Sequence, residues 1–109
     1  MKLKLNTELK NYDGEPIKDE ENKAFMLAEV LLRALLAPLQ EDMKDSDSDR
    51  LWKWEMAQTI HKNREGDIEL KPSEADKLKD RVRNTMPSPA IYGNVREIID
   101  QAKQKEKTK

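Results

Sequence analysis

Three aspartates at alternating positions carry the most suggestive side-chain chemistry in the sequence. Asp45, Asp47 and Asp49 match the first three oxygen-ligand positions of a calcium-binding EF-hand loop. Such a loop also needs a glycine at its sixth position and a bidentate glutamate at its twelfth, where this chain has Arg50 and Met56. The turn and the closing ligand are both missing, so we expect no calcium site and no other metal site.

The acidic run is better interpreted as the start of a helix. Ser46 or Ser48 can cap backbone amides, and aspartates in a first turn face the positive end of the helix dipole. We therefore predict a helix from about Asp47 to Asn63.

The two tryptophans of the chain lie on opposite sides of this predicted helix. Trp52 and Trp54 are two positions apart, so at 100° per residue their side chains point about 200° apart. One apolar stripe is the predicted core face of the helix, and it comprises Trp52, Met56 and Ile60, with Ala57 at its edge.

A second stripe runs along the other side through Leu51, Trp54 and His61. Two apolar faces on one helix indicate either that the helix is sandwiched between neighbours, the commoner arrangement, or that one stripe meets a partner. The sequence leaves open which tryptophan belongs to the core. Leu51, Trp54 and His61 are the candidate partner face.

Basic side chains around the tryptophans indicate an alternative, a small nucleic-acid-binding module. Arg50, Lys53, Lys62 and Arg64 could contact phosphates while Trp54 stacks on bases. Against it, the helix begins with three aspartates and the chain carries a net charge of -1. Nucleic acid is therefore not the expected partner.

The sequence predicts no enzyme. It contains one histidine, no cysteine and three glycines, so it lacks a thiol nucleophile, a glycine-rich phosphate loop and a paired-histidine metal motif. His61 is most simply a surface residue. We expect no cofactor and no small-molecule substrate.

Length and composition indicate one small domain. The 109 residues are 36% hydrophobic and 39% charged, which implies a compact core beneath an ionic surface. We expect the domain to span residues 1–103, with a frayed charged tail at 104–109.

The apolar stretch at 24–39 is too short and too charged to cross a bilayer, and residues 1–15 lack the apolar block of a signal peptide, so a cytoplasmic protein is expected.

The periodicity predicts an α+β fold that is mainly helical, with about four helices and two or three short strands. Strands are expected at 2–5, 15–18 and 67–70, the first two joined as a hairpin by the turn NYDG.

A central helix should cover 24–37, be buried nearly all round and end at Pro38. A third helix should cover 74–84, with Ser73 and Asp76 as its capping box, and a fourth should start near Asn94. The expected core residues of the central helix are Phe25, Leu27, Ala28, Leu31, Leu32, Leu35 and Leu36, and those of the fourth are Val95, Ile98, Ile99 and Ala102.

In their order, these elements resemble a type of small protein often encoded by bacteriophage and prophage genomes. The segments that carry the resemblance are KLKLNTELKNYDGEPI, AFMLAEVLLRALL, EMAQTIHK, GDIEL and PAIYGNVREIID, which together span about residues 2 to 100. The resemblance rests on the order of elements. The resemblance implies a phage-associated accessory protein, and it assigns no catalytic residues to this chain.

The leading functional hypothesis is a non-enzymatic accessory protein that binds a protein partner in assembly, in regulation or in interference with a host factor. The nucleic-acid-binding module is the first alternative. A structural homo-oligomer is the second, since residues 1–49 sum to a charge of -5 and residues 50–109 to +4, which could hold copies head to tail.

Overall fold

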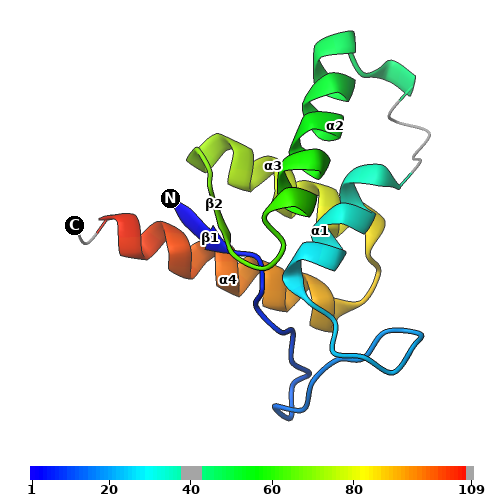
Figure 1. Ribbon diagram of the computed structural model, residues 1–109, viewed down its shortest axis with the longest axis vertical. Helices are drawn as coiled ribbons and strands as arrows, with labels where there is room; N and C mark the ends of the chain where they lie inside the picture. The colour runs from blue at the N-terminus through cyan, green and yellow to red at the C-terminus, as the bar shows by residue number, and fades with distance from the viewer. Residues whose placement is uncertain (38–42, 108–109) are drawn as a thin grey trace.

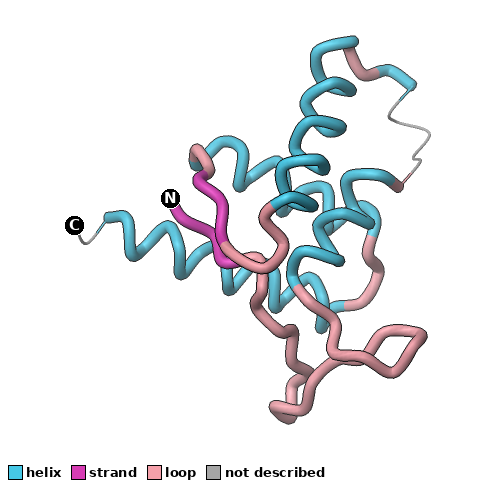
Figure 2. Tube along the Cα trace, viewed as in Figure 1, coloured by secondary structure: helices cyan, strands magenta, loops and turns pink. Residues whose placement is uncertain are grey.

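The computed structural model describes residues 1–37 and 43–107. Within these residues, four helices and a two-stranded antiparallel sheet form a mainly helical α+β domain, as predicted (Figures 1 and 2). None of these helices has the length and apolar character needed to cross a bilayer. The elements in chain order are β1 Lys2–Lys4, α1 Leu27–Leu36, α2 Asp47–Lys62, β2 Asp67–Glu69, α3 Pro72–Thr85 and α4 Pro89–Lys107.

Helix α1 packs against both α2 and α3, and α3 packs in turn against α4. Six of the ten residues of α1 are buried, which agrees with the central position predicted for this helix. Leu36 is an exception, because its side chain is 54% exposed at the last turn, so its predicted place in the core is wrong. Pro38, the expected helix terminator, lies outside the described residues, and Ala37 is the C-cap.

The sheet pairs the first strand with a distant one. β1 runs antiparallel to β2, with Leu3 opposite Ile68, and both of these side chains are buried. The predicted hairpin between 2–5 and 15–18 is therefore wrong. Residues 15–18 form only isolated bridges, in part because Pro16 has no N–H to donate to a ladder.

Residues 8–26 instead form an arm that projects from the helices, visible as a looped stretch between β1 and α1 in Figure 2. The predicted turn lies inside this arm, where Gly14 has a φ of 85° and donates its N–H to the carbonyl of Asn11 at 2.9 Å. Three isolated antiparallel bridges hold the arm, between Glu8 and Met26, Lys10 and Pro16, and Lys18 and Ala24.

Two polar contacts attach the arm to helices. Asn94 of α4 accepts a hydrogen bond from the backbone N–H of Lys10 at 3.1 Å and donates one to its carbonyl at 2.5 Å. Arg33 of α1 donates two hydrogen bonds to the carboxylate of Glu20, at 2.9 and 3.1 Å. The arm is thereby fixed at two points separated along its length.

Helices α3 and α4 both begin earlier than predicted. Pro72 occupies the first turn of α3, and Glu74 rather than Asp76 accepts the hydrogen bond from the backbone N–H of the N-cap Lys71, at 2.9 Å. The predicted cap by Ser73 is therefore wrong. Helix α4 begins at Pro89, so Asn94 lies inside the helix and bonds the arm.

The predicted apolar stripe of α4 is confirmed. Val95 and Ile99 are fully buried, while Ile98 and Ala102 are partly buried against the core. The helix continues to Lys107, so residues 104–107 of the expected tail are helical, and residues 108–109 lie outside the described part of the chain.

Arg81 on α3 is the one buried charged side chain among the described residues, with 8% of its surface exposed. Its guanidinium donates hydrogen bonds to the carbonyls of Ala34 at 2.6 Å and Ala37 at 2.5 Å, where the last carbonyls of α1 lack helical partners. A cation here also faces the negative end of the α1 dipole. Arg81 therefore ties α3 to the end of α1.

Replacing Arg81 with leucine should destabilise the domain by about 2 to 3 kcal/mol, because one buried and one partly buried carbonyl lose charged donors while the apolar stem is kept. Urea unfolding measures the change. Arg83→Leu is the control, since Arg83 is exposed and contacts Asp80 on its own helix. Equal stability of the two variants would show that Arg81 does not hold α1 and α3 together.

The contact between Arg33 and Glu20 predicts a titration. Hydrogen bonding to Arg33, followed by the backbone and the Coulombic attraction of Arg33, lowers the pKa of the exposed Glu20 carboxyl from 4.5 to about 2. A folded-state pKa below the unfolded value stabilises the fold above the unfolded pKa, so this contribution should be lost as the pH falls from about 4.5 to about 2. Carbon-detected NMR should show Glu20 titrating near the lower value in the native chain and moving upward in Arg33→Gln, but not in Arg83→Gln.

Candidate functional site

Helix α2 begins at the serine and aspartate residues that the sequence analysis predicted to start it. Ser46 is the N-cap, and its hydroxyl oxygen accepts the backbone N–H of Asp49 at 3.2 Å. Asp47 and Asp49 lie in the first turn, as expected for acidic groups at a helix N-terminus. Asp45 lies just before the helix and pairs with Lys53 at 2.5 Å.

No set of three histidine, aspartate or glutamate side chains within residues 1–37 and 43–107 is arranged as a metal-binding group. The hydroxyl of Ser46 donates to the Asp49 carboxylate at 3.0 Å. Two of the three aspartates in the run are thus engaged with neighbouring side chains.

One face of α2 belongs to the core, as predicted. Met56, Ala57 and Ile60 are buried, and Trp52 is partly buried against them. The indole N–H of Trp52 donates to the Glu74 carboxylate at 3.3 Å, and the ammonium of Lys77 lies 4.8 Å from the centre of its ring. Trp52 thus joins α2 to α3.

Glu74 serves both helices. Its carboxylate accepts the backbone N–H of Lys71 at 2.9 Å in addition to the Trp52 indole. The Lys71 bond lowers the pKa of Glu74 most; burial opposes this shift, and the Trp52 bond adds to it. Glu74 is therefore an ionised acceptor that fixes the orientation of Trp52.

The other face of α2 carries the candidate partner residues, and the structure places all three on the surface. Leu51 is 51% exposed and Trp54 is 54% exposed, and they lie three residues apart on adjacent positions of the helix surface. His61 is exposed two turns after Trp54. We name Leu51, Trp54 and His61 the outer stripe. Of the two tryptophans, Trp52 contacts the core and Trp54 points away from it.

The four basic residues of the nucleic-acid alternative do not form one open cationic surface. Lys53 pairs with Asp45 at 2.5 Å, and Arg64 pairs with Glu29 of α1 at 2.6 Å. Arg50 donates to a backbone carbonyl at 3.0 Å, and Lys62 is exposed in the last turn. Two of the four cations are thus balanced by carboxylates.

Sequence reasoning missed one exposed apolar side chain beside this site. Met43 is 78% exposed, and its carbonyl accepts the hydrogen bond from Arg50, which keeps it near the first turn of α2. The signal that could have identified it is a single apolar residue within the acidic connector between α1 and α2. Sequence reasoning also missed a groove between β1 and α4.

Comparison with known proteins gives no relative: no family model, no curated protein and no solved structure matches the chain. The outer stripe and the groove are therefore interpreted from their own chemistry.

The two tryptophans should respond differently to the same conservative change. Trp52→Phe removes the hydrogen bond to Glu74 and should destabilise the domain by about 1 kcal/mol, whereas Trp54→Phe should change stability by less than about 0.5 kcal/mol. Each variant retains one tryptophan, so acrylamide quenching can report its exposure. The fluorescence of Trp54 in Trp52→Phe should be quenched more strongly than that of Trp52 in Trp54→Phe. Stronger quenching of Trp52 than of Trp54 would mean that α2 is rotated about its axis so that Trp52 faces the solvent and Trp54 faces the core.

Proposed function

We propose that this chain is a non-enzymatic accessory protein that acts by binding another protein through the outer stripe of α2. The observation that carries the proposal is the exposure of Leu51 and Trp54, each more than half open on a helix whose other face is buried. Exposed large apolar side chains that lie together mark interaction sites. The phage-type order of elements supports a role in assembly, in regulation or in interference with a host factor.

The outer stripe has the physical character of an interface anchor. Tryptophan is among the residues that most often dominate binding energy, and it does so best when a partner fully desolvates it. Because Met56, Ala57 and Ile60 are buried on the opposite side, the backbone that carries Trp54 is already ordered. Binding then costs little additional backbone entropy.

The charges around α2 favour a protein partner over a nucleic acid. Asp45 and Glu29 neutralise Lys53 and Arg64, and Asp47 and Asp49 lie at the N-terminal end of the same helix. A phosphate backbone would meet both signs of charge there, and it would gain little from the release of counterions. A protein surface can match a mixed pattern around an apolar centre.

The test is affinity capture from extract of the organism that carries the gene, comparing the native chain with the double variant Leu51→Ser/Trp54→Ser. The variant should lose the protein that the native chain enriches, and binding of that purified protein should weaken by about 30-fold, the loss that follows from removing an anchor worth about 2 kcal/mol. Both substituted positions are exposed, so the variant should unfold within about 0.5 kcal/mol of the native chain.

Tyr12→Ser is the matched control, because Tyr12 is 96% exposed in a turn of the arm and is not part of α2. Capture of the same proteins by the native chain and the double variant would contradict the proposal. Binding of single-stranded DNA or RNA that the double variant loses would favour the nucleic-acid alternative. A mass above 12.7 kDa by light scattering, restored to 12.7 kDa in the double variant, would show that the outer stripe binds a second copy.

A further inference from the structure

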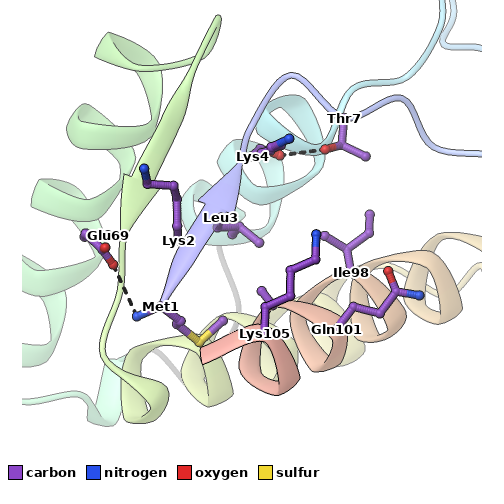
Figure 3. A pocket seen from close by; sticks show the side chains of 10 residues that line it. Met1, Lys2, Leu3, Lys4, Thr7, Glu69, Ile98, Gln101 and Lys105 are labelled. Carbon is purple, nitrogen blue, oxygen red and sulfur yellow. Dashed lines mark hydrogen bonds and ion pairs between the residues drawn. The ribbon is translucent and has the colours of Figure 1, made fainter. Parts of the chain in front are cut away.

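A groove of about 450 Å³ lies between β1 and α4 (Figure 3). Ile98, Gln101, Ala102 and Lys105 make its helical wall, at the i, i+3, i+4 and i+7 positions of one face of α4. Residues 1–4 line it along the strand. The groove therefore runs parallel to one edge of a sheet.

That edge of the sheet is open, because β1 is paired with β2 on one side only. The carbonyl of Met1 accepts the N–H of Leu70, the N–H of Leu5 donates to Gly66, and Leu3 lies opposite Ile68. Odd-numbered residues thus bond toward β2, and alternation in an antiparallel ladder directs the main-chain groups of Lys2 and Lys4 toward the groove.

Part of this edge is already used by the chain itself. The hydroxyl of Thr7 donates to the carbonyl of Lys4 at 2.8 Å. No other described element takes up the N–H and C=O of Lys2 or the N–H of Lys4. A strand edge with main-chain donors and acceptors left over can accept a further strand from another chain.

The side chains around the groove favour an acidic occupant. Lys2 and Lys4 are exposed on the same outer face of β1, and no ion pair in the described part of the chain involves either of them. Among the lining residues that the structure describes, the one carboxylate is that of Glu69, which lies 3.2 Å from the amino group of Met1. Leu3, Ile98 and Ala102 are apolar residues of the same lining.

From these observations we propose that the groove binds an extended acidic segment of another protein, which adds to the free edge of β1 as a third strand. In such a pair, residues opposite Lys2 and Lys4 share their outer face, and the residue between them shares the inner face of Leu3. The preferred segment therefore alternates acidic, apolar, acidic, with its apolar side chain directed at Ile98 and Ala102. Three residues at about 3.3 Å each match the length of β1. This surface is separate from the outer stripe and goes beyond the function proposed for it.

The probe is a blocked, fluorescein-labelled peptide of alternating glutamate and valine, titrated into the full chain by fluorescence anisotropy. We expect saturable binding that weakens at least tenfold in Lys2→Glu/Lys4→Glu. A peptide with lysine in place of glutamate should not bind. Lys10→Glu/Lys18→Glu is the matched control, since it reverses two exposed lysines on the arm and should leave binding unchanged, as should Leu51→Ser/Trp54→Ser.

Strand addition is separated from simple charge attraction by the peptide backbone. Methylating the peptide nitrogens that would face β1 keeps every charge but removes the donors, and it should also weaken binding about tenfold, the loss expected for about one hydrogen bond. Three results would overturn the proposal: no binding of the acidic peptide, equal binding by the methylated peptide, or tighter binding of a labelled oligothymidylate that Lys2→Glu/Lys4→Glu abolishes. Circular dichroism melting of each variant ensures that a lost signal reflects the groove and not unfolding.

Discussion

The rotation of α2 about its own axis is the constraint on which the proposed interaction site depends. Burial of Met56, Ala57 and Ile60 against the core sets this rotation, and the hydrogen bond from Trp52 to Glu74 supports it from α3. With these side chains inside, Leu51 and Trp54 have to face outward, because they lie on the opposite part of the helix surface. The exposure of Trp54 thus follows from the packing of the rest of the helix.

A small core makes such constraints important. Charged residues outnumber hydrophobic ones in this chain, so burial alone gives a modest margin of stability. Arg81 adds to the stability of the domain by donating hydrogen bonds to two carbonyls at the end of α1. Helix α2 also packs against α1. Other charged groups form pairs near the surface, such as Lys79 with Asp100 and Lys103 with Asp76, which link α3 to α4. Exposed pairs of this kind contribute little each, so the buried arginine carries more of the structure.

Local patterns predicted the helices well, and they predicted contacts between distant segments poorly. Ser46 and the spacing of Val95 and Ile99 were sufficient for the start of α2 and the buried face of α4, because both depend on neighbouring residues. Pairing of β1 with β2 joins segments more than sixty residues apart, and no local turn signal reports it. The turn NYDG was recognised correctly as a turn but assigned to the wrong strands.

In the candidate site too, local patterns predicted some features, and others depend on contacts between distant segments. Helical geometry placed Trp52 and Trp54 on opposite sides, and the stripe with Met56 and Ile60 favoured the Trp52 side for the core. Only the packing of α1 and α3 against α2 decides which side is buried. Arg81 and Asn94 were missed as structural residues because a polar side chain on a helix is usually solvated, and only the fold shows the carbonyls that each one meets. The groove at β1 was missed because the wall of α4 that completes it is distant in the sequence, and only the fold brings the two together.

Trp52 of α2 packs within the domain, and Trp54 is the side chain that we propose binds another protein. Fluorine NMR of the chain labelled with 5-fluorotryptophan, recorded before and after adding the captured partner, tests this claim at both positions in one experiment. The account predicts that the Trp54 resonance shifts or broadens on binding while the Trp52 resonance keeps its position. A partner that binds and perturbs only Trp52, or neither tryptophan, would contradict it.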